Sequence, residues 1–173
     1  SEELTPRERF DEGWEEHNGV KKTIKRPYQA EYDRLKSLDL TEDDYRFFVE
    51  ESNKAGITPM LTVFSRKRIP LAASLPYQNE KMVKVASYDC ASAAMITELA
   101  DHFDNLVIST GATFDDEIKN TTELLKSKNK KLTFLHCVTN YPNTIAMANL
   151  ARMDWLRRFT PTVGWSDHTL VSR

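Results

Sequence analysis

Residues 163–169 read V-G-W-S-D-H-T, a short apolar run that changes abruptly into four consecutive polar residues. This pattern is typical of a buried strand that delivers side chains to a site at its carboxyl end. His168 could bind a metal or transfer a proton, Asp167 could orient its ring, and Ser166 could bind an oxyanion. The alternative is an ordinary turn after a strand, in which Asp167 and Ser166 bond to the local backbone.

The chain before this stretch alternates strands with helices. Continuous apolar runs predict buried strands, and apolar residues at helical spacing predict helices. Such alternation indicates βαβ units and therefore a parallel sheet covered by helices. Thr41 and Thr113 are the expected N-caps of two helices, and Gly56 ends the first of them. The predicted strands are 57–64, 82–87, 106–110, 132–137 and 162–165, and the later helices are 66–75, 91–102, 113–126 and 145–159.

Each predicted strand ends in polar or titratable residues. In a parallel sheet these ends share one edge, so we expect the side chains to converge. Such an edge is found on the active face of a (β/α)8 barrel and in the crevice of an open doubly wound sheet. Lysine with several hydroxyls suits a phosphate or carboxylate, whereas histidine with aspartate suits a metal or proton transfer. The strand-end residues before the last strand are Thr62, Lys84, Ser87, Ser109, Thr110, His136 and Thr139.

Three of the candidates have competing interpretations. Lys84 lies inside an apolar strand and must reach solvent or an anion, because a buried unpaired ammonium is very unfavourable. His136 is either a core histidine bonded to the backbone or a catalytic group. Asp89 is either a helix cap or an acceptor for a substrate hydroxyl.

Composition excludes several classes of protein. With 24 basic and 26 acidic residues, the net charge of -2 predicts no binding to nucleic acid or to an anionic membrane. No apolar run approaches the roughly 20 residues of a membrane span. Two distant cysteines, Cys90 and Cys137, indicate no disulfide framework and favour a reducing, cytoplasmic compartment.

Residues 1–36 are polar and show no clear apolar period. We predict an extended, loop-rich segment with one or two short helices, and a turn at His17-Asn18-Gly19. Residues 37–173 form the predicted α/β domain.

Four motifs, in order and at βα spacing, resemble the sialic acid synthase family. This family comprises the N-acetylneuraminate synthases and their bacterial legionaminate, pseudaminate and spore-coat relatives. Its motifs read approximately K-I-x-S, S-T-G, H-C-x-x-x-Y-P and G-x-S-D-H-T. Here they are K-V-A-S at 84–87, S-T-G at 109–111, H-C-V-T-N-Y-P at 136–142 and G-W-S-D-H-T at 164–169.

The resemblance implies a (β/α)8 TIM barrel, of which this chain covers about strands 3 to 7. It implies condensation of phosphoenolpyruvate with an N-acylated amino sugar of the N-acetylmannosamine type, with release of phosphate. A divalent metal, Mn²⁺ or Mg²⁺, and a homodimer of the full-length protein are also implied.

Carried over position by position, the resemblance also implies residue roles. His168 matches one of two histidine metal ligands. Asp89 and Tyr141 match positions near the sugar, Asp89 being grouped with Lys84 and Asp167 as catalytic. The residues that match substrate-binding positions are Thr62, Ser87, Ser109, Thr139, Tyr141 and Ser166, with Lys84 beside the phosphate.

The chain departs from the family pattern at Asn143-Thr144, where Thr-Pro is usual. Two other functions stay open: a metal-dependent aldolase on the same barrel, and a non-catalytic sugar-binding remnant. Because five parallel strands leave two edges unpaired, we expect the isolated 173-residue chain to be unstable or to associate, and to lack activity.

Overall fold

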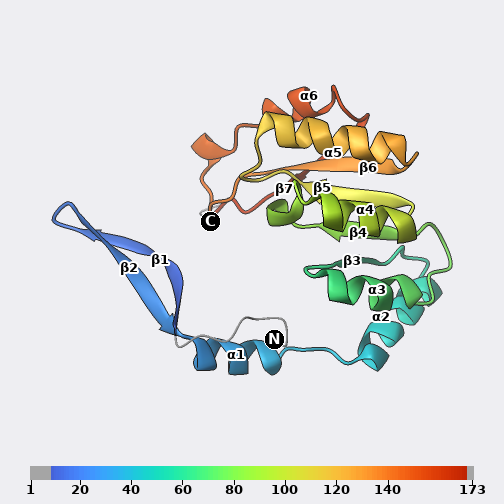
Figure 1. The fold of residues 1–173 in the computed structure, drawn as a ribbon, viewed down its shortest axis with the longest axis horizontal. Coiled ribbons are helices and arrows are strands. Elements are labelled where there is room, and N and C mark those ends of the chain that lie inside the picture. Colours follow the sequence, from blue (N-terminus) through green and yellow to red (C-terminus); the bar gives the residue numbers. More distant parts are fainter. Residues whose placement is uncertain (1–8, 171–173) are drawn as a thin grey trace. The chain divides into compact units, whose positions relative to one another are not determined.

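The computed structural model describes residues 9–170. The chain forms two compact units, Ser1–Tyr45 and Arg46–Arg173, which are described separately. Figure 1 labels the helices and strands of both.

The described part of the first unit contains an antiparallel hairpin, β1 (Arg9–His17) and β2 (Val20–Pro27), followed by helix α1 (Tyr28–Lys36). The prediction of a loop is therefore wrong for residues 9–27. Opposite charges stand at paired register positions, such as Glu15 with Lys22, so the hairpin carries no apolar period that would reveal it. The predicted turn is confirmed: Asn18 and Gly19 have φ angles of 52° and 75°. Residues 1–8 lie outside the described residues.

Helix α2 (Glu42–Lys54) begins as predicted at Thr41. The Thr41 hydroxyl accepts a hydrogen bond from the Asp44 backbone N–H (3.2 Å), and the Asp44 carboxylate accepts one from the Thr41 N–H (2.8 Å). This reciprocal pair satisfies two donors at the start of the helix. Gly56, with φ of 70°, follows its end, as predicted.

The second unit is built on a five-stranded parallel sheet whose strands lie in sequence order. A doubly wound sheet would reverse its strand order partway, so this order excludes that alternative. The predicted α/β fold, a run of consecutive strands of a TIM barrel, is confirmed. The strands are β3 (Met60–Thr62), β4 (Met82–Val85), β5 (Asn105–Ser109), β6 (Lys131–Cys137) and β7 (Thr162–Ser166).

The helices bury one face of this sheet. Alternate strand residues such as Val83, Val85, Leu106, Ile108 and Phe134 join residues of α3, α4, α5 and α6 in one buried core. The intervening strand residues face the other side. The helices are α3 (Ile69–Ser74), α4 (Ala93–His102), α5 (Asp115–Ser127) and α6 (Arg152–Leu156), with 3-10 turns η1 (Arg66–Arg68), η2 (Ser87–Asp89) and η3 (Ile145–Met147).

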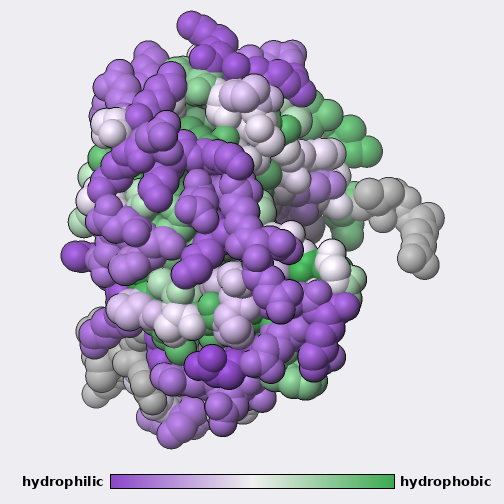
Figure 2. Space-filling view, turned by 90° about the vertical axis from the view of Figure 1, so that its right-hand side faces the viewer, coloured by the Kyte–Doolittle hydropathy of each residue, from purple (hydrophilic) through white to green (hydrophobic). Residues whose placement is uncertain are grey.

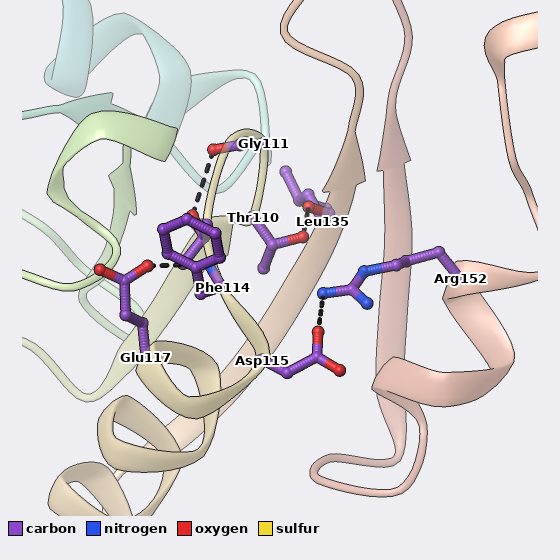
Figure 3. Close-up of polar contacts among 8 residues, drawn as sticks. Thr110, Gly111, Phe114, Asp115, Glu117, Leu135 and Arg152 are labelled. Carbon is purple, nitrogen blue, oxygen red and sulfur yellow. Dashed lines mark hydrogen bonds and ion pairs between the residues drawn. The ribbon is translucent and has the colours of Figure 1, made fainter.

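Two helix predictions need correction. The predicted helix at 145–159 is two short pieces, η3 and α6, because Asn149 between them adopts a left-handed φ of 44°. Helix α5 is capped at Phe114 and not at Thr113. In Figure 3 the Glu117 carboxylate accepts the Phe114 N–H (2.7 Å). The Thr113 hydroxyl instead donates to the Gly111 carbonyl (3.1 Å).

Candidate functional site

Three strand ends meet at Gly111, directly after β5. The Gly111 N–H donates a hydrogen bond to the Ser87 hydroxyl (3.0 Å). A Cβ atom at Gly111 would lie 2.3 Å from the Thr139 hydroxyl oxygen and 3.0 Å from that of Ser87. The two hydroxyls therefore converge on a backbone position where a Cβ atom would displace at least one of them.

A small cavity of about 160 Å³ opens beside this point. The Thr139 hydroxyl is buried and has no hydrogen-bond partner among the described residues. A buried, unpartnered hydroxyl next to Ser87 can donate to an anionic oxygen, which suits a phosphate or carboxylate group. The cavity is lined by Ser87, Tyr88, Ala91, Gly111, Ala112, Thr113, Glu117 and Thr139. We call Ser87, Gly111 and Thr139 the cradle.

Lys84 lies on the sheet face that the helices leave uncovered. Its neighbours Val83 and Val85 belong to the core, so strand alternation directs Lys84 to the opposite face. Thr62 is its register partner on β3. Lys84 is half-buried, and among the described residues it takes part in no ion pair. Its ammonium is therefore available to an anion.

Ser109 shares this face. It is 2% exposed, and its hydroxyl oxygen has no hydrogen-bond partner among the described residues. Thr110, the next residue, is structural instead, because its N–H and its hydroxyl both donate to the Leu135 carbonyl (3.0 and 3.1 Å; Figure 3).

The end of β7 forms a second group. Ser166 pairs with Cys137 in the sheet register. The Asp167 carboxylate accepts the Thr169 N–H (2.8 Å), and hydrogen bonding from Thr169 lowers the pKa of Asp167. Asp167 therefore closes a turn, as the alternative interpretation of this stretch expected. No hydrogen bond from Asp167 to the His168 ring is present among the described residues.

His168 is exposed and lies against the loop that follows β6. Its ring centroid is 4.3 Å from that of Tyr141, and its backbone carbonyl accepts the Asn143 N–H (2.8 Å). Asn143 also forms a parallel bridge with Thr169. The loop after β6 thus holds the segment after β7.

The structure separates the competing interpretations of two further residues. His136 is buried, and its Nε2 hydrogen-bonds with the Ala148 carbonyl (2.7 Å), so it is bonded to the backbone as a core histidine. Asp89 lies in η2, and α4 is preceded by Ser92 as its N-cap residue, so Asp89 does not cap that helix. Burial raises the pKa of Asp89.

An ion pair joins the segment after β5 to the segment after β6, next to the cradle. Arg152 of α6 bonds to the Asp115 carboxylate at the start of α5 (2.6 Å), as Figure 3 shows. The Arg152 guanidinium also lies 4.3 Å from the Trp155 ring centroid. Arg152 and Asp115 line an open cleft of about 910 Å³ that continues to Thr139.

The described residues do not by themselves form a metal centre. Among residues 9–170, no three or more His, Cys, Asp or Glu side chains are grouped so that they could hold a metal ion. His168 could supply one ligand, but its neighbour Asp167 is engaged in the turn. No chemical step is therefore assigned to a metal here.

The sequence-predicted residues thus fall into two groups joined by the loop after β6. Ser87 and Thr139 meet in the cradle, whereas His168 and Tyr141 meet at the end of β7. Sequence reasoning missed two residues that organise these groups, Gly111 and Asn143. The glycine that follows Ser109-Thr110 at the end of a strand could have indicated a close contact there. For Asn143, the sequence offered only its departure from the family motif.

The fold is that of a TIM-barrel α/β protein, and the candidate site lies at the carboxyl edge of the sheet. Residues 3–172 match the model of the NeuB family. The chain belongs to the NeuB family.

Similar proteins agree with this assignment. The chain is 33% identical over 147 residues to N,N'-diacetyllegionaminic acid synthase of Legionella pneumophila, covering 82% of the chain and 40% of the relative. It is 32% identical over 125 residues to pseudaminic acid synthase of Helicobacter pylori, covering 71% and 36%. The chain therefore spans less than half the length of these relatives.

A solved structure shows the same fold. The N-acetylneuraminic acid synthetase of Leptospira borgpetersenii, crystallised with citrate, superposes with a TM-score of 0.74 at 23% identity. The match covers 82% of this chain and 49% of that one.

Proposed function

We propose that the protein condenses phosphoenolpyruvate with an N-acylated amino sugar and consumes one water, to give a sialic-type acid and phosphate. Membership of the NeuB family and the names of its synthase relatives support this. The observation that carries the proposal is the cradle, where the hydroxyls of Ser87 and Thr139 converge on Gly111. Thr139 has an unpartnered buried hydroxyl there, which is free to donate to a phosphate oxygen.

In this proposal the chain binds and orients phosphoenolpyruvate and forms no covalent intermediate with it. Ser87 and Thr139 donate hydrogen bonds to the phosphate, and Lys84 supplies the positive charge that compensates it. Fixed donors of this kind position the methylene carbon to attack the aldehyde carbon of the sugar. They also stabilise the charge that develops as water adds to the former enol carbon and phosphate leaves. Ser109, Ser166 and Thr62 complete the substrate-binding set.

Two residues are assigned to the sugar side. Asp89 is partly buried and is not a helix cap, which leaves its carboxyl free to bond a sugar hydroxyl. Tyr141 follows β6 at the same edge of the sheet. Asp167 acts through the turn that it closes before Thr169.

His168 is the proposed contribution of this segment to a divalent metal site, Mn²⁺ or Mg²⁺. The remaining ligands would come from elsewhere in the protein, because the described residues around His168 do not complete a set.

We further propose that the full-length protein is a homodimer whose subunits cover this site. Large apolar side chains stand exposed on the loops after all five strands of the sheet, which indicates a surface that another element covers. By contrast, the face at which the strands begin is mainly hydrophilic (Figure 2). The exposed large apolar residues on these loops include Phe64, Tyr88, Phe114, Tyr141, Ile145 and Leu170.

Both free cysteines, Cys90 and Cys137, are buried and unpaired, which supports the proposed cytoplasmic location. Among residues 9–170, no helix has the length and apolar character needed to cross a bilayer.

The test is phosphate release by the full-length protein from phosphoenolpyruvate, with Mn²⁺ and a panel of N-acyl mannosamine-type sugars. We expect release that depends on the sugar and that the Ser87→Ala variant loses. Reversible formation of pyruvate would identify an aldolase instead. Sugar binding without turnover by the folded, metal-loaded protein would identify a binding protein.

A further inference from the structure

The His168 ring is exposed to solvent, yet its orientation is constrained. The Tyr141 ring packs against it, with centroids 4.3 Å apart and planes inclined by 59°. Among the described residues, Tyr141 is the aromatic residue that makes a ring contact with His168. A side chain that is free in solvent samples several rotamers, so this contact selects among them.

The backbone of His168 is held by the same loop. Asn143 donates its N–H to the His168 carbonyl (2.8 Å), and Leu170 donates its N–H to the Asn143 carbonyl (3.0 Å). These two bonds enclose Thr169, which bridges to Asn143. Both the main chain and the ring of His168 therefore depend on the residues that follow β6.

The loop that provides these contacts is itself anchored. Asn143 is 2% exposed, so its side chain is packed inside the loop. The Tyr141 hydroxyl lies 3.9 Å from the Cys137 sulfur at the end of β6. Cys137 in turn pairs with Ser166, two residues before His168, in the sheet register. These contacts therefore link the end of β6 directly to the end of β7.

We propose that Tyr141 is a positioning residue, whose ring sets the orientation of the His168 imidazole, with Asn143 fixing the backbone beneath it. This role adds to its place on the sugar side, and its effect on turnover rests on the proposed function. The ring of Tyr141, and not its hydroxyl, makes the contact with His168. Phenylalanine at position 141 should therefore preserve the orientation of the His168 ring, whereas leucine should not.

The experiment uses the full-length protein labelled at its histidines, and it compares Tyr141→Phe with Tyr141→Leu. The His168 ring signals are assigned by their loss in His168→Ala. An aromatic ring at this distance shifts them from the positions of a free histidine. We expect Tyr141→Phe to keep the shifted signals and Tyr141→Leu to move them toward the free positions. Phe47→Leu is the matched control, because Phe47 on α2 is exposed and makes no ring contact with His168 within the described residues.

The kinetic arm measures kcat and KM for phosphoenolpyruvate in the same variants. A misplaced reacting group can lower turnover by about 100-fold, so we expect Tyr141→Leu to reduce kcat by about tenfold or more with little change in KM. Tyr141→Phe should lose less kcat than Tyr141→Leu, since the ring contact is retained, and the loss of any hydroxyl contact to the sugar would appear in the KM for the sugar. Asn143→Thr keeps the backbone N–H and should retain the shifted His168 signals.

Two results would overturn the proposal. Unchanged His168 signals in Tyr141→Leu would show that the ring does not orient the imidazole. An equal loss of kcat in Tyr141→Phe and Tyr141→Leu, with His168 signals retained in the former, would show that the hydroxyl acts directly. If the parent protein turns over no sugar, the proposed function fails, while the signals of His168 still decide whether Tyr141 positions it.

Discussion

The Thr139 hydroxyl oxygen lies so close to Gly111 that a Cβ atom there would be 2.3 Å away. The segment after β5 and the loop after β6 therefore meet so closely that any side chain at residue 111 would displace the Thr139 hydroxyl. This contact brings the hydroxyls of Thr139 and Ser87 to one residue, whose backbone N–H donates to Ser87. The site therefore depends on the close approach of Thr139 to the Gly111 backbone, as well as on its polar side chains.

Gly111→Ala should consequently damage both the site and the fold. The new methyl group displaces Thr139 or Ser87, and overpacking of this kind typically destabilises a protein by about 1–3 kcal/mol. Affinity for phosphoenolpyruvate should fall with it. Urea unfolding and calorimetric binding on the full-length protein measure the two effects. The control is Gly56→Ala, which has open space around it and is expected to strain only the backbone. Full affinity in Gly111→Ala would contradict the cradle.

Lys84→Met should weaken phosphoenolpyruvate binding without lowering stability. The ammonium forms no ion pair among the described residues, so its removal leaves no charged partner unsatisfied. Loss of a charge-assisted bond to the phosphate corresponds to about 1.5–3 kcal/mol, or roughly 10-fold to 100-fold in affinity. Titration of phosphoenolpyruvate into the variant measures the change. Lys130→Met, at a half-buried lysine directly before β6, should bind as the parent does. A marked loss of stability in Lys84→Met would show a structural role instead.

Arg152→Ala should lower the free energy of unfolding by about 1 kcal/mol. The Arg152–Asp115 pair joins α6 to α5, and stacking on Trp155 adds to it, but both partners are partly exposed. Denaturant unfolding provides the value. Arg157→Ala removes an exposed ion pair with Asp154 on the same helix. This substitution should change the free energy of unfolding by only about 0.3 kcal/mol. Equal effects in the two variants would show that the pair between helices has no special role.

The cap of α2 should make a small contribution to acid sensitivity. Hydrogen bonds from Thr41 lower the pKa of Asp44 in the folded state below its usual value. Stability from this group is present above the unfolded pKa and is lost as the pH falls through the folded pKa. Thr41→Ala should raise the pKa of Asp44 toward its ordinary value, as carboxyl carbon titration would show. An unchanged pKa would mean that the cap does not act on this carboxylate.

Sequence reasoning recovered what depends on local patterns. Apolar runs identified all five strands of the sheet, and the capping pattern at Thr41 identified the start of α2. Because parallel strands share one edge, the meeting of Ser87 with Thr139 also followed from their positions after strands. These inferences need only periodicity and topology.

The remaining features depend on contacts between distant residues. The hairpin at 9–27 has charges at paired positions, so no apolar period reveals it. Asn149 breaks the predicted helix through a backbone conformation that its sequence permits but does not require. The packing of Tyr141 on His168 joins two loops 27 positions apart, and no local pattern in either loop predicts it.

The most direct test of the cradle compares phosphoenolpyruvate affinity in Thr139→Val and Thr133→Val of the full-length protein. Each substitution replaces one hydroxyl by a methyl group of similar size, Thr139 in the cradle and Thr133 within β6. We predict that Thr139→Val weakens binding by about tenfold or more, because it removes a donor to the phosphate, while Thr133→Val binds as the parent does. Equal affinities in all three proteins would contradict the assignment of this site to the phosphate.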